Sequence, residues 1–360
     1  MKQPFERSVS LIRSCVERGL IPSAALAMGI GDEVMVKECW GVTSVTEDAQ
    51  PVNSQTLYDM ASVSKIYATT MITLRFIERG ILDLADMLPR YFGDLVPEDK
   101  QHITIFHLLT HTSGYPDHIL LHAALTDPEE TVPFLLKTPL KHPVGAVVEY
   151  SCMGFILLGK LLEKVSGKPL DQLMREEVSE PLGLTSTGYH PLDKLICTAN
   201  TAYTERSYVD GSWLVGRVHD ENAFFLNGVA GNAGVFSNLD DFIRYTRMLA
   251  NHGVLDGQVY LPRCIFDAAI HDYTPGMDEN RGLGFWCAGG YYSMSGQFTD
   301  QQSFGHNGFT GPHVLVNPNT GLWVCMMTNR VHPTRENANH LRIRRLLHTQ
   351  MQIDYEEMKR

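Results

Sequence analysis

The residues best suited to chemistry are a serine and a lysine three positions apart, in the tetrad Ser62-Val63-Ser64-Lys65. Residues three apart on a helix share one face, so the Lys65 amine would lie within reach of the Ser62 hydroxyl. A serine hydroxyl becomes an effective nucleophile when a neighbouring group accepts its proton. Taken alone, the spacing fits a helix-capping serine and an exposed lysine equally well, so the tetrad needs supporting motifs.

Further motifs follow in order along the chain. Residues 103–114 read ITIFHLLTHTSG, residues 150–154 read YSCMG, and residues 304–311 read FGHNGFTG. With the Ser-x-x-Lys tetrad, this layout resembles the serine β-lactamase and penicillin-binding protein superfamily. It is similar to the class C branch, which also holds family VIII-type esterases, D-amino-acid peptidases and acyltransferases. The resemblance runs from about residue 8 to residue 350.

The resemblance implies a role for each matching residue. Ser62 would be the acylated nucleophile, Lys65 its proton acceptor, and Tyr150 a second general acid/base that protonates the leaving group. Tyrosine can act as a base only where an adjacent ammonium stabilises its phenolate, so which of Lys65 and Tyr150 is the base is a property of the pair. The backbone N–H groups of Ser62 and Phe309 would form the oxyanion hole, with Gly308 allowing close approach of the backbone.

Two departures from the family pattern bear on the substrate. Cys152 stands where the second motif has asparagine, and a thiol is a weaker hydrogen-bonding group than an amide. His306-Asn307-Gly308 stands where Lys-Thr-Gly is common, so a fixed positive charge is missing there, because imidazole is mostly neutral at pH 7. We count His306 with the catalytic residues and Asn307 with the substrate-binding ones. These departures favour an ester or small amide over efficient β-lactam hydrolysis.

Other polar residues have weaker claims. Cys152 as a competing nucleophile is less plausible than a structural thiol. A group at 219–222, namely His219, Asp220 and Asn222, either lines the cleft or holds a loop. The glycine-rich segment 228–234 is typical of close backbone packing, since it has no basic residues that would favour phosphate.

Metal and cofactor motifs are weak or absent. The pair His118 and His122 would share one face of a helix, but no third ligand supports it, and the pair His107 and His111 has the same weakness. The chain has no GxSxG, GxGxxG, GxxxxGK[ST] or HExxH motif. We therefore expect no metal and no organic cofactor.

The periodicity of the chain predicts the elements that must position these residues. Residues 5–20 form an amphipathic helix, and hairpins join 24–30 to 33–40 and 314–317 to 322–328. Further helices are expected at 62–79, 104–110, 153–165 and 334–351, and one more begins at the capping-box spacing Ser237-x-x-Asp240. Strands at the chain ends and helices between them predict an α+β fold of the β-lactamase/transpeptidase type. Its antiparallel sheet is built from both termini and flanked by helices.

This architecture predicts two lobes of a single β-lactamase-related domain with the active site between them. Residues 1–75 and 270–360 would form the sheet-plus-helix lobe, and residues 76–269 the mostly helical lobe. The 360-residue chain is long enough for such a two-lobed unit.

Composition limits the partners and the compartment. The net charge is −11 and no basic stripe exists, so we expect no nucleic-acid partner. No apolar run approaches the roughly 18 residues of a membrane span, and no signal peptide is recognised. Seven cysteines are widely spaced, without a CxxC pair, which favours free thiols and a cytoplasmic location.

The expected function is therefore hydrolysis of a small-molecule ester, amide or β-lactam through an acyl-enzyme on Ser62. The alternatives are a penicillin-binding D,D-peptidase, a β-lactamase proper, or a protein that is acylated without turnover. The oligomeric state stays open.

Overall fold

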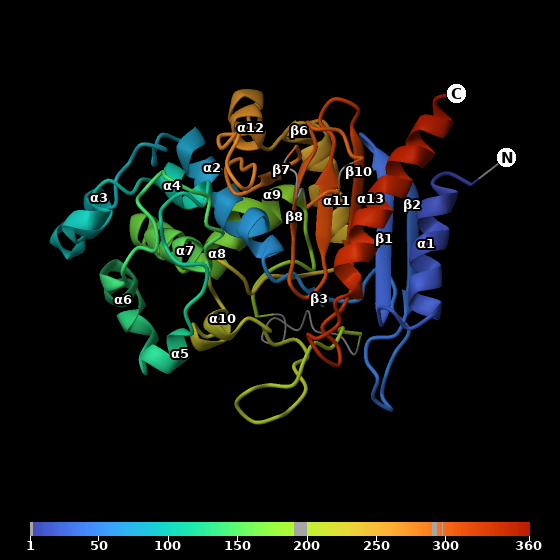
Figure 1. Ribbon diagram of the computed structural model, residues 1–360, viewed down its shortest axis with the longest axis horizontal. Helices are drawn as coiled ribbons and strands as arrows, with labels where there is room; N and C mark the ends of the chain where they lie inside the picture. The colour runs from blue at the N-terminus through green and yellow to red at the C-terminus, as the bar shows by residue number, and fades with distance from the viewer. Residues whose placement is uncertain (1–2, 191–199, 290–293, 297) are drawn as a thin grey trace.

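The computed structural model describes residues 3–190, 200–289, 294–296 and 298–360, so Cys197 lies outside the described residues. Its centre is a six-stranded sheet in the order β2-β1-β10-β9-β8-β7, with every neighbouring pair antiparallel. The strands are β1 Ser23–Ile30, β2 Glu33–Gly41, β7 Trp286–Cys287, β8 Phe304–Asn307, β9 His313–Val316 and β10 Leu322–Met327. Strands from both ends of the chain therefore meet in one sheet, as predicted (Figure 1).

Strands β1 and β2 form the predicted N-terminal hairpin. Gly31 takes a φ of 56° in the turn between them, a conformation that glycine adopts without strain. Strand β10 pairs with β1 on one side and with β9 on the other, which joins the two predicted hairpins edge to edge.

Alternate residues of the central strands enter two different cores. On β1, Leu26 and Met28 pack in a core cluster with helix residues of the two termini, whereas Ala25 and Ala27 face the larger core of the helical part. This two-residue alternation is the normal pleat of a strand buried on both faces. The sheet therefore forms a middle layer between two sets of helices.

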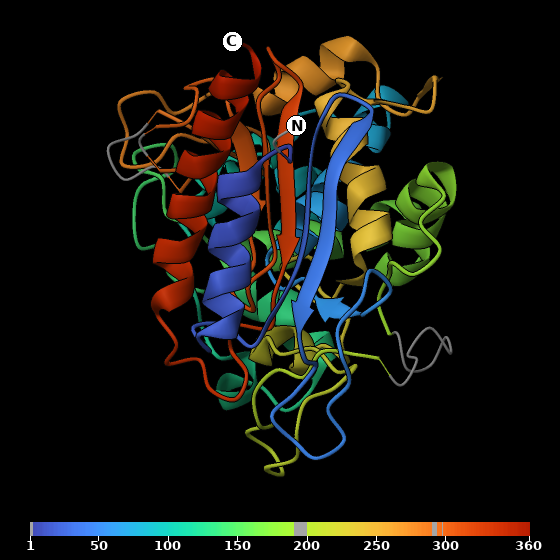
Figure 2. The same cartoon turned by 90° about the vertical axis from the view of Figure 1, so that its right-hand side faces the viewer.

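Helices α1 Glu6–Glu17 and α13 Asn339–Met358 lie side by side on one face (Figures 1 and 2). Helix α11 Leu239–Ala250 packs on the other face against β1, β9 and β10. The remaining described helices are η1 Lys65–Thr70, α2 Met71–Glu78, α3 Pro89–Phe92, η2 Gly93–Leu95, η3 Glu98–Lys100, α4 Ile105–Leu109, α5 Leu121–Ala124, η4 Pro128–Glu130, α6 Thr131–Lys137, α7 Cys152–Ser166, α8 Leu170–Met174, η5 Arg175–Ser179, α9 Glu180–Leu182, α10 Glu221–Phe225 and α12 Arg263–Ile270. Two small ladders complete the fold, β3 Tyr58–Asp59 with β4 Phe236–Ser237 and β5 Val254–Leu255 with β6 Gln258–Val259.

Several predicted helix starts were wrong. Helix α11 is capped by Asn238, whose side chain accepts from the Asp241 N–H, so the Ser237-x-x-Asp240 spacing is one residue out of register. Helix α13 begins at Asn339 rather than near residue 334. The segment 62–79 begins with a π-helical turn, Lys65–Thr70, before it becomes regular in α2.

The proposed lobe boundaries at 75 and 270 stay a prediction, and helix α11 of the predicted helical lobe packs directly on the sheet. Among the described residues, no helix combines the length and apolarity needed to cross a membrane.

Candidate active site

Ser62 sits in a tight turn that a buried carboxylate holds in place. The residue before it, Ala61, has a φ of 44°, and its N–H donates to Asp59 Oδ1 at 2.8 Å. The other oxygen of the Asp59 carboxylate accepts from the His219 N–H at 2.7 Å. The Thr310 hydroxyl donates to the Asp59 backbone carbonyl at 2.7 Å. Asp59 thus connects the nucleophile turn to two distant segments, and sequence reasoning missed it.

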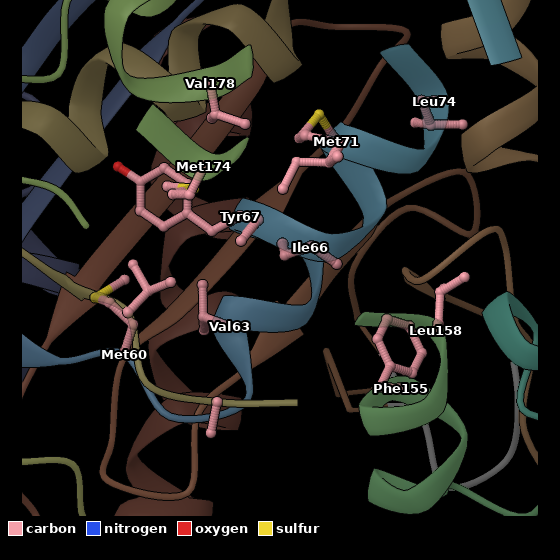
Figure 3. Packing of buried hydrophobic residues seen from close by; sticks show 14 of the residues in the cluster. Met60, Val63, Ile66, Tyr67, Met71, Leu74, Phe155, Leu158, Met174 and Val178 are labelled. Atoms are coloured by element: carbon pink, nitrogen blue, oxygen red, sulfur yellow. The ribbon is translucent and has the colours of Figure 1, made fainter. Parts of the chain in front are cut away.

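The helix after Ser62 is anchored by its apolar face. Val63, Ile66 and Tyr67 are fully buried, and Figure 3 shows them among core residues of neighbouring helices. This packing fixes the rotation of the helix about its own axis. Ser62 and Lys65 are therefore held together on the opposite face. The π-helical turn that starts at Lys65 is a feature often found at functional sites.

The Lys65 side chain is completely buried and donates in three directions. Its Nζ lies 3.1 Å from Ser62 Oγ, 3.0 Å from the Asn232 carbonyl oxygen and 3.5 Å from Cys152 Sγ. Burial disfavours the ammonium, but the acidic Cys152 thiol and Tyr150 phenol favour it, and the pKa of Lys65 is raised above its ordinary value. Three acceptors around one amine match the three donors of an ammonium group.

Tyr150 lies just before α7, against His111. The Ser151 hydroxyl caps α7 by accepting from the Gly154 N–H at 3.2 Å, and the Ser151 N–H donates to His111 Nδ1 at 3.0 Å. The His111 ring lies 4.5 Å from the Tyr150 ring. Lys65 Nζ is 4.9 Å from the centre of that ring, which places the amine beside the phenol.

The end of strand β8 brings a second backbone segment to Ser62. At Gly308, a Cβ atom would lie 2.6 Å from the Met60 carbonyl oxygen, so only glycine allows this approach. The backbone N–H groups of Ser62 and Phe309 donate to no acceptor within the described residues. Ser62 and Phe309 line the same cavity, and an oxyanion hole requires two such unpaired amides near the nucleophile.

His306 is a neutral imidazole at this site. Burial lowers its pKa well below the ordinary range, and the charges of Lys65 and Arg281 lower it further. Its Nδ1 donates to the Asn307 carbonyl at 3.0 Å, because a carbonyl can only accept. Its Nε2 therefore carries a lone pair, and neither this atom nor Asn307 Oδ1 has a partner among the described residues.

The predicted site residues converge on one cavity of about 390 Å³. Its lining includes Ser62, Tyr150, His306, Asn307, Gly308 and Phe309. Lys65 contacts Ser62, and Cys152 contacts Lys65, which completes the set of eight predicted residues.

The third motif supplies no fixed positive charge, but other segments bring arginines to the cavity. His306 itself is neutral, but Arg281, Arg330 and Arg344 also line the cavity. These arginines come from segments outside the recognised motifs, so motif reading could not find them.

The weaker candidates hold the surrounding structure. Asn222 accepts from the Leu121 N–H at 2.8 Å and donates to the Ile119 carbonyl at 2.8 Å, so it fixes a loop. Asp220 caps α10, and His219 Nε2 pairs with Glu205 at 2.8 Å. None of the residues at 219, 220 and 222 lines the cavity described above.

The glycine-rich segment 228–234 packs closely, as predicted. A Cβ on Gly231 would lie 2.0 Å from the Phe155 carbonyl oxygen.

The histidine pairs serve other purposes. His107 forms a capping box with Thr104 at the start of α4, and His111 accepts from Ser151. The expectation that His118 and His122 share a helical face was wrong, because α5 begins at Leu121. Within the described part of the chain, no three His, Cys, Asp or Glu side chains form a group that could hold a metal.

Comparison with known proteins agrees with this site. A sequence model of the β-lactamase family matches residues 9–349. N-acetylmuramyl-L-alanine amidase from Bacillus subtilis (strain 168) is 30% identical over 349 residues, which cover 86% of this chain and 78% of that protein. A protein from Escherichia coli (strain K12) that is named D-alanyl-D-alanine carboxypeptidase is 31% identical over 348 residues, covering 86% of this chain and 79% of its own.

Solved structures show the same fold at lower identity. Unliganded simvastatin synthase (LovD) from Aspergillus terreus superposes with a TM-score of 0.76 at 22% identity and covers 100% of both chains. EstCE1, a hydrolase with promiscuous acyltransferase activity, gives a TM-score of 0.75 at 20% identity, over 94% of this chain and 98% of that one. The fold, the family match and the relatives agree, and the chain belongs to the β-lactamase family of serine hydrolases.

Proposed function

We propose that this protein hydrolyses small esters or amides through an acyl-enzyme on Ser62. The observation that carries the proposal is the convergence at Ser62 of a buried amine and two unpaired backbone amides. The amine is Lys65 Nζ, 3.1 Å from the hydroxyl, and the amides belong to Ser62 and Phe309. A nucleophile, a proton-transfer partner and an oxyanion hole are the parts that acyl transfer needs.

The environment of Lys65 favours Tyr150 as the proton acceptor. The raised pKa of Lys65 favours the ammonium form of the amine, so we assign acceptance of the Ser62 proton to Tyr150. The same charge stabilises a Tyr150 phenolate, which would take the proton as Ser62 Oγ bonds to the substrate carbonyl carbon. The oxygen of the tetrahedral intermediate would accept from the N–H groups of Ser62 and Phe309.

Collapse of the intermediate breaks the bond to the leaving group, and Tyr150 returns its proton to that group. Water then attacks the acyl-enzyme along the reverse path, with Tyr150 taking a proton from water and returning it to Ser62 Oγ. His306 supplies a hydrogen-bond acceptor beside Tyr150 through the lone pair of Nε2.

Cys152 makes an ester or small amide a better substrate than a peptide. The thiol contacts Lys65 at 3.5 Å in the place where the family has an asparagine, and it offers the substrate a weak hydrogen-bonding group. A D,D-peptidase activity is the second candidate, and the relatives named carboxypeptidase and amidase favour it.

The cysteines bear on the compartment in which the protein works. Six described cysteines are free thiols, which supports the proposal that the protein works in the reducing environment of the cytoplasm.

The test is steady-state turnover of three probes in parallel: a p-nitrophenyl short-chain ester, a D-alanyl-D-alanine peptide and a penicillin. We expect the ester to turn over many times per protein molecule, with Ser62→Ala abolishing turnover. Ser64→Ala is the matched control, since the Ser64 hydroxyl only accepts from the Val235 N–H at 3.1 Å. Turnover of the peptide alone would shift the function to the D,D-peptidase, and a single stoichiometric acylation without turnover would contradict hydrolysis.

A further inference from the structure

The side chain of Phe309, which carries one of the two unpaired backbone amides, is not anchored in the core. Its ring lines the active-site cavity and is 48% exposed. Core packing, which fixes Val63 and Ile66 beside Ser62, therefore does not fix the direction of the Phe309 N–H. Because an oxyanion hole works only when its donors already point at the developing charge, another contact has to hold this residue.

Arg330 holds Phe309 at two points. Its Nε donates to the Phe309 carbonyl at 2.6 Å, and its guanidinium carbon lies 4.3 Å from the centre of the Phe309 ring, which is a cation–π contact. The carbonyl and the ring are carried by the same Cα atom. When both are held, the bond angles at Cα determine the direction of the backbone nitrogen.

Arg330 is itself held in one orientation. It is 8% exposed, and its Nη1 donates to the Arg335 and Asn337 carbonyls at 3.1 Å each. All the hydrogen bonds that Arg330 makes within the described part of the chain therefore go to backbone carbonyls. A planar fork of donors suits this use, whereas the single ammonium of a lysine cannot reach all three carbonyls.

A second ring contact connects Phe309 to the turn at Ser62. The His219 ring stacks on the Phe309 ring, with 5.8 Å between the ring centres and 25° between the planes. The His219 N–H donates to Asp59, and the other oxygen of the Asp59 carboxylate accepts from the N–H of Ala61, next to Ser62. The Phe309 ring is therefore connected to the same carboxylate that holds the nucleophile turn.

We propose that Arg330 is a positioning residue for the oxyanion hole, which orients the Phe309 N–H toward the tetrahedral intermediate formed at Ser62. This inference rests on the proposed hydrolysis at Ser62. Arg330 also lines the cavity, so direct contact with the substrate is the alternative that the test has to separate. A positioning residue acts on the transition state and changes kcat, whereas a contact that binds substrate and transition state equally changes KM.

The test combines hydrolysis of p-nitrophenyl butanoate with inhibition by phenylboronic acid. In the inhibited protein, Ser62 Oγ bonds to boron, the hydroxyl proton is released, and an oxygen on the tetrahedral boron takes the place of the oxyanion. The inhibition constant Ki does not depend on the fraction of protein that is active. It therefore reports on the oxyanion hole even where a variant folds less completely.

Arg330→Met keeps the length of the side chain but removes its donors and its charge. We expect kcat to fall about 10²- to 10³-fold, as for loss of one oxyanion donor, and the Ki of phenylboronic acid to rise about tenfold or more. KM should stay within about threefold, because the oxyanion hole serves acylation and deacylation alike. Arg330→Lys keeps the charge and one donor group, so it should recover about tenfold of the lost kcat.

Arg206→Met is the matched control. The Arg206 guanidinium carbon lies 4.1 Å from the centre of the Trp213 ring, and Nη1 donates to the Gly211 carbonyl at 2.8 Å. This is the same kind of double contact, to a ring and a backbone carbonyl, but Arg206 does not line the cavity described above. The control variant should keep kcat, KM and Ki.

The outcomes separate this inference from the proposed function. Unchanged kcat and Ki in folded Arg330→Met, or a loss that appears in KM alone, overturn the positioning role and leave hydrolysis at Ser62 standing. If circular dichroism shows that Arg330→Met does not fold, Arg330→Lys decides, and unchanged kcat and Ki in that variant overturn the proposal. An unmodified protein that neither hydrolyses the ester nor binds the boronic acid contradicts the proposed function itself.

Discussion

Lys65 and Tyr150 carry different parts of the proton transfer in this account. The ammonium of Lys65 provides a permanent charge, and the phenol of Tyr150 moves the proton. This division follows from the three acceptors around Lys65 Nζ and from its raised pKa. For Lys65 itself to act as the base, its pKa would have to be lowered. The surroundings of Lys65 have the opposite effect on its pKa.

The first prediction concerns the Tyr150 hydroxyl. Tyr150→Phe keeps the ring against His111 but removes the proton-transfer group, so kcat for an ester should fall by about 10²- to 10⁴-fold. The matched control is Tyr115→Phe, because the buried Tyr115 hydroxyl has no partner among the described residues. Stopped-flow hydrolysis of a p-nitrophenyl ester measures the effect, and a Tyr150→Phe enzyme with unchanged kcat would contradict the assigned role.

The second prediction concerns Cys152. Cys152→Asn replaces a thiol that contacts Lys65 with an amide that can accept from the lysine and donate to a substrate carbonyl. The ratio of amide to ester kcat/KM should rise about tenfold, which corresponds to one gained hydrogen bond. Cys264→Asn, at an exposed free thiol, should leave the ratio unchanged. An unchanged or lower ratio in Cys152→Asn would show that this position does not set amide recognition.

At the scale of elements, the site depends on how closely the end of β8 approaches the Ser62 turn. Gly308 permits the contact, and Asp59 ties the turn to Thr310 on the β8 side. The packing of η1 against the helical core holds the other half of the site (Figure 3). The position of the Phe309 N–H therefore depends on β8, on the turn at Ser62, and on the contact between them.

The third prediction tests that contact. In Gly308→Ala the added methyl group would lie 2.6 Å from the Met60 carbonyl oxygen, so the strand end must move away and take the Phe309 N–H with it. Loss of one oxyanion donor should lower kcat about 10²- to 10³-fold. In Gly188→Ala the added methyl group meets no atom within 4 Å, so this variant is the control. A fully active, folded Gly308→Ala protein would exclude Phe309 from the oxyanion hole.

The sequence predicted elements whose signals are local. The Gly31-Asp32 turn marked the first hairpin, and Gly167 marked the end of α7, where it takes a left-handed conformation with a φ of 69°. The capping error at Ser237 arose because neighbouring polar residues can both cap a helix, and tertiary packing selected Asn238. The π-helical turn at Lys65 has no local signal that the sequence reveals.

The residues of the site divide in the same way. Ser62, Lys65, Tyr150 and Gly308 belong to spaced motifs and were therefore predictable. Arg344 reaches the cavity only because α13 folds back beside α1 and packs its histidines against His313 of β9, which depends on long-range topology (Figures 1 and 2). The neutral state of His306 follows from burial, which the sequence alone does not reveal.

At the scale of the whole molecule, buried imidazoles make stability depend on pH. His313, His340 and His348 are buried near Arg344, between the sheet and α13, and burial lowers the pKa of each, in His348 to about 3. In the unfolded chain the same groups titrate near pH 6.5. Between these values the unfolded state binds protons that the folded state does not, so the free energy of unfolding decreases as the pH falls.

The fourth prediction gives this effect a size. Each such histidine should contribute a slope of up to about 1.4 kcal/mol per pH unit below pH 6.5, present until the pH approaches the folded pKa. Urea unfolding between pH 7 and pH 4.5 should show the loss, and His348→Asn should reduce the slope by about one proton. The exposed His102→Asn is the control. A slope that His348→Asn does not change would contradict the buried neutral state of that imidazole.

The central claim is that Ser62 carries the acyl group, and covalent labelling tests it most directly. Intact-protein mass after brief exposure to a fluorophosphonate, followed by peptide mapping, should show one adduct on Ser62 and none on Ser64, two residues further along the chain. The adduct should disappear in Ser62→Ala and persist in Ser64→Ala. An adduct on another residue, or an adduct that survives Ser62→Ala, would contradict the assignment of the nucleophile and the mechanism built on it.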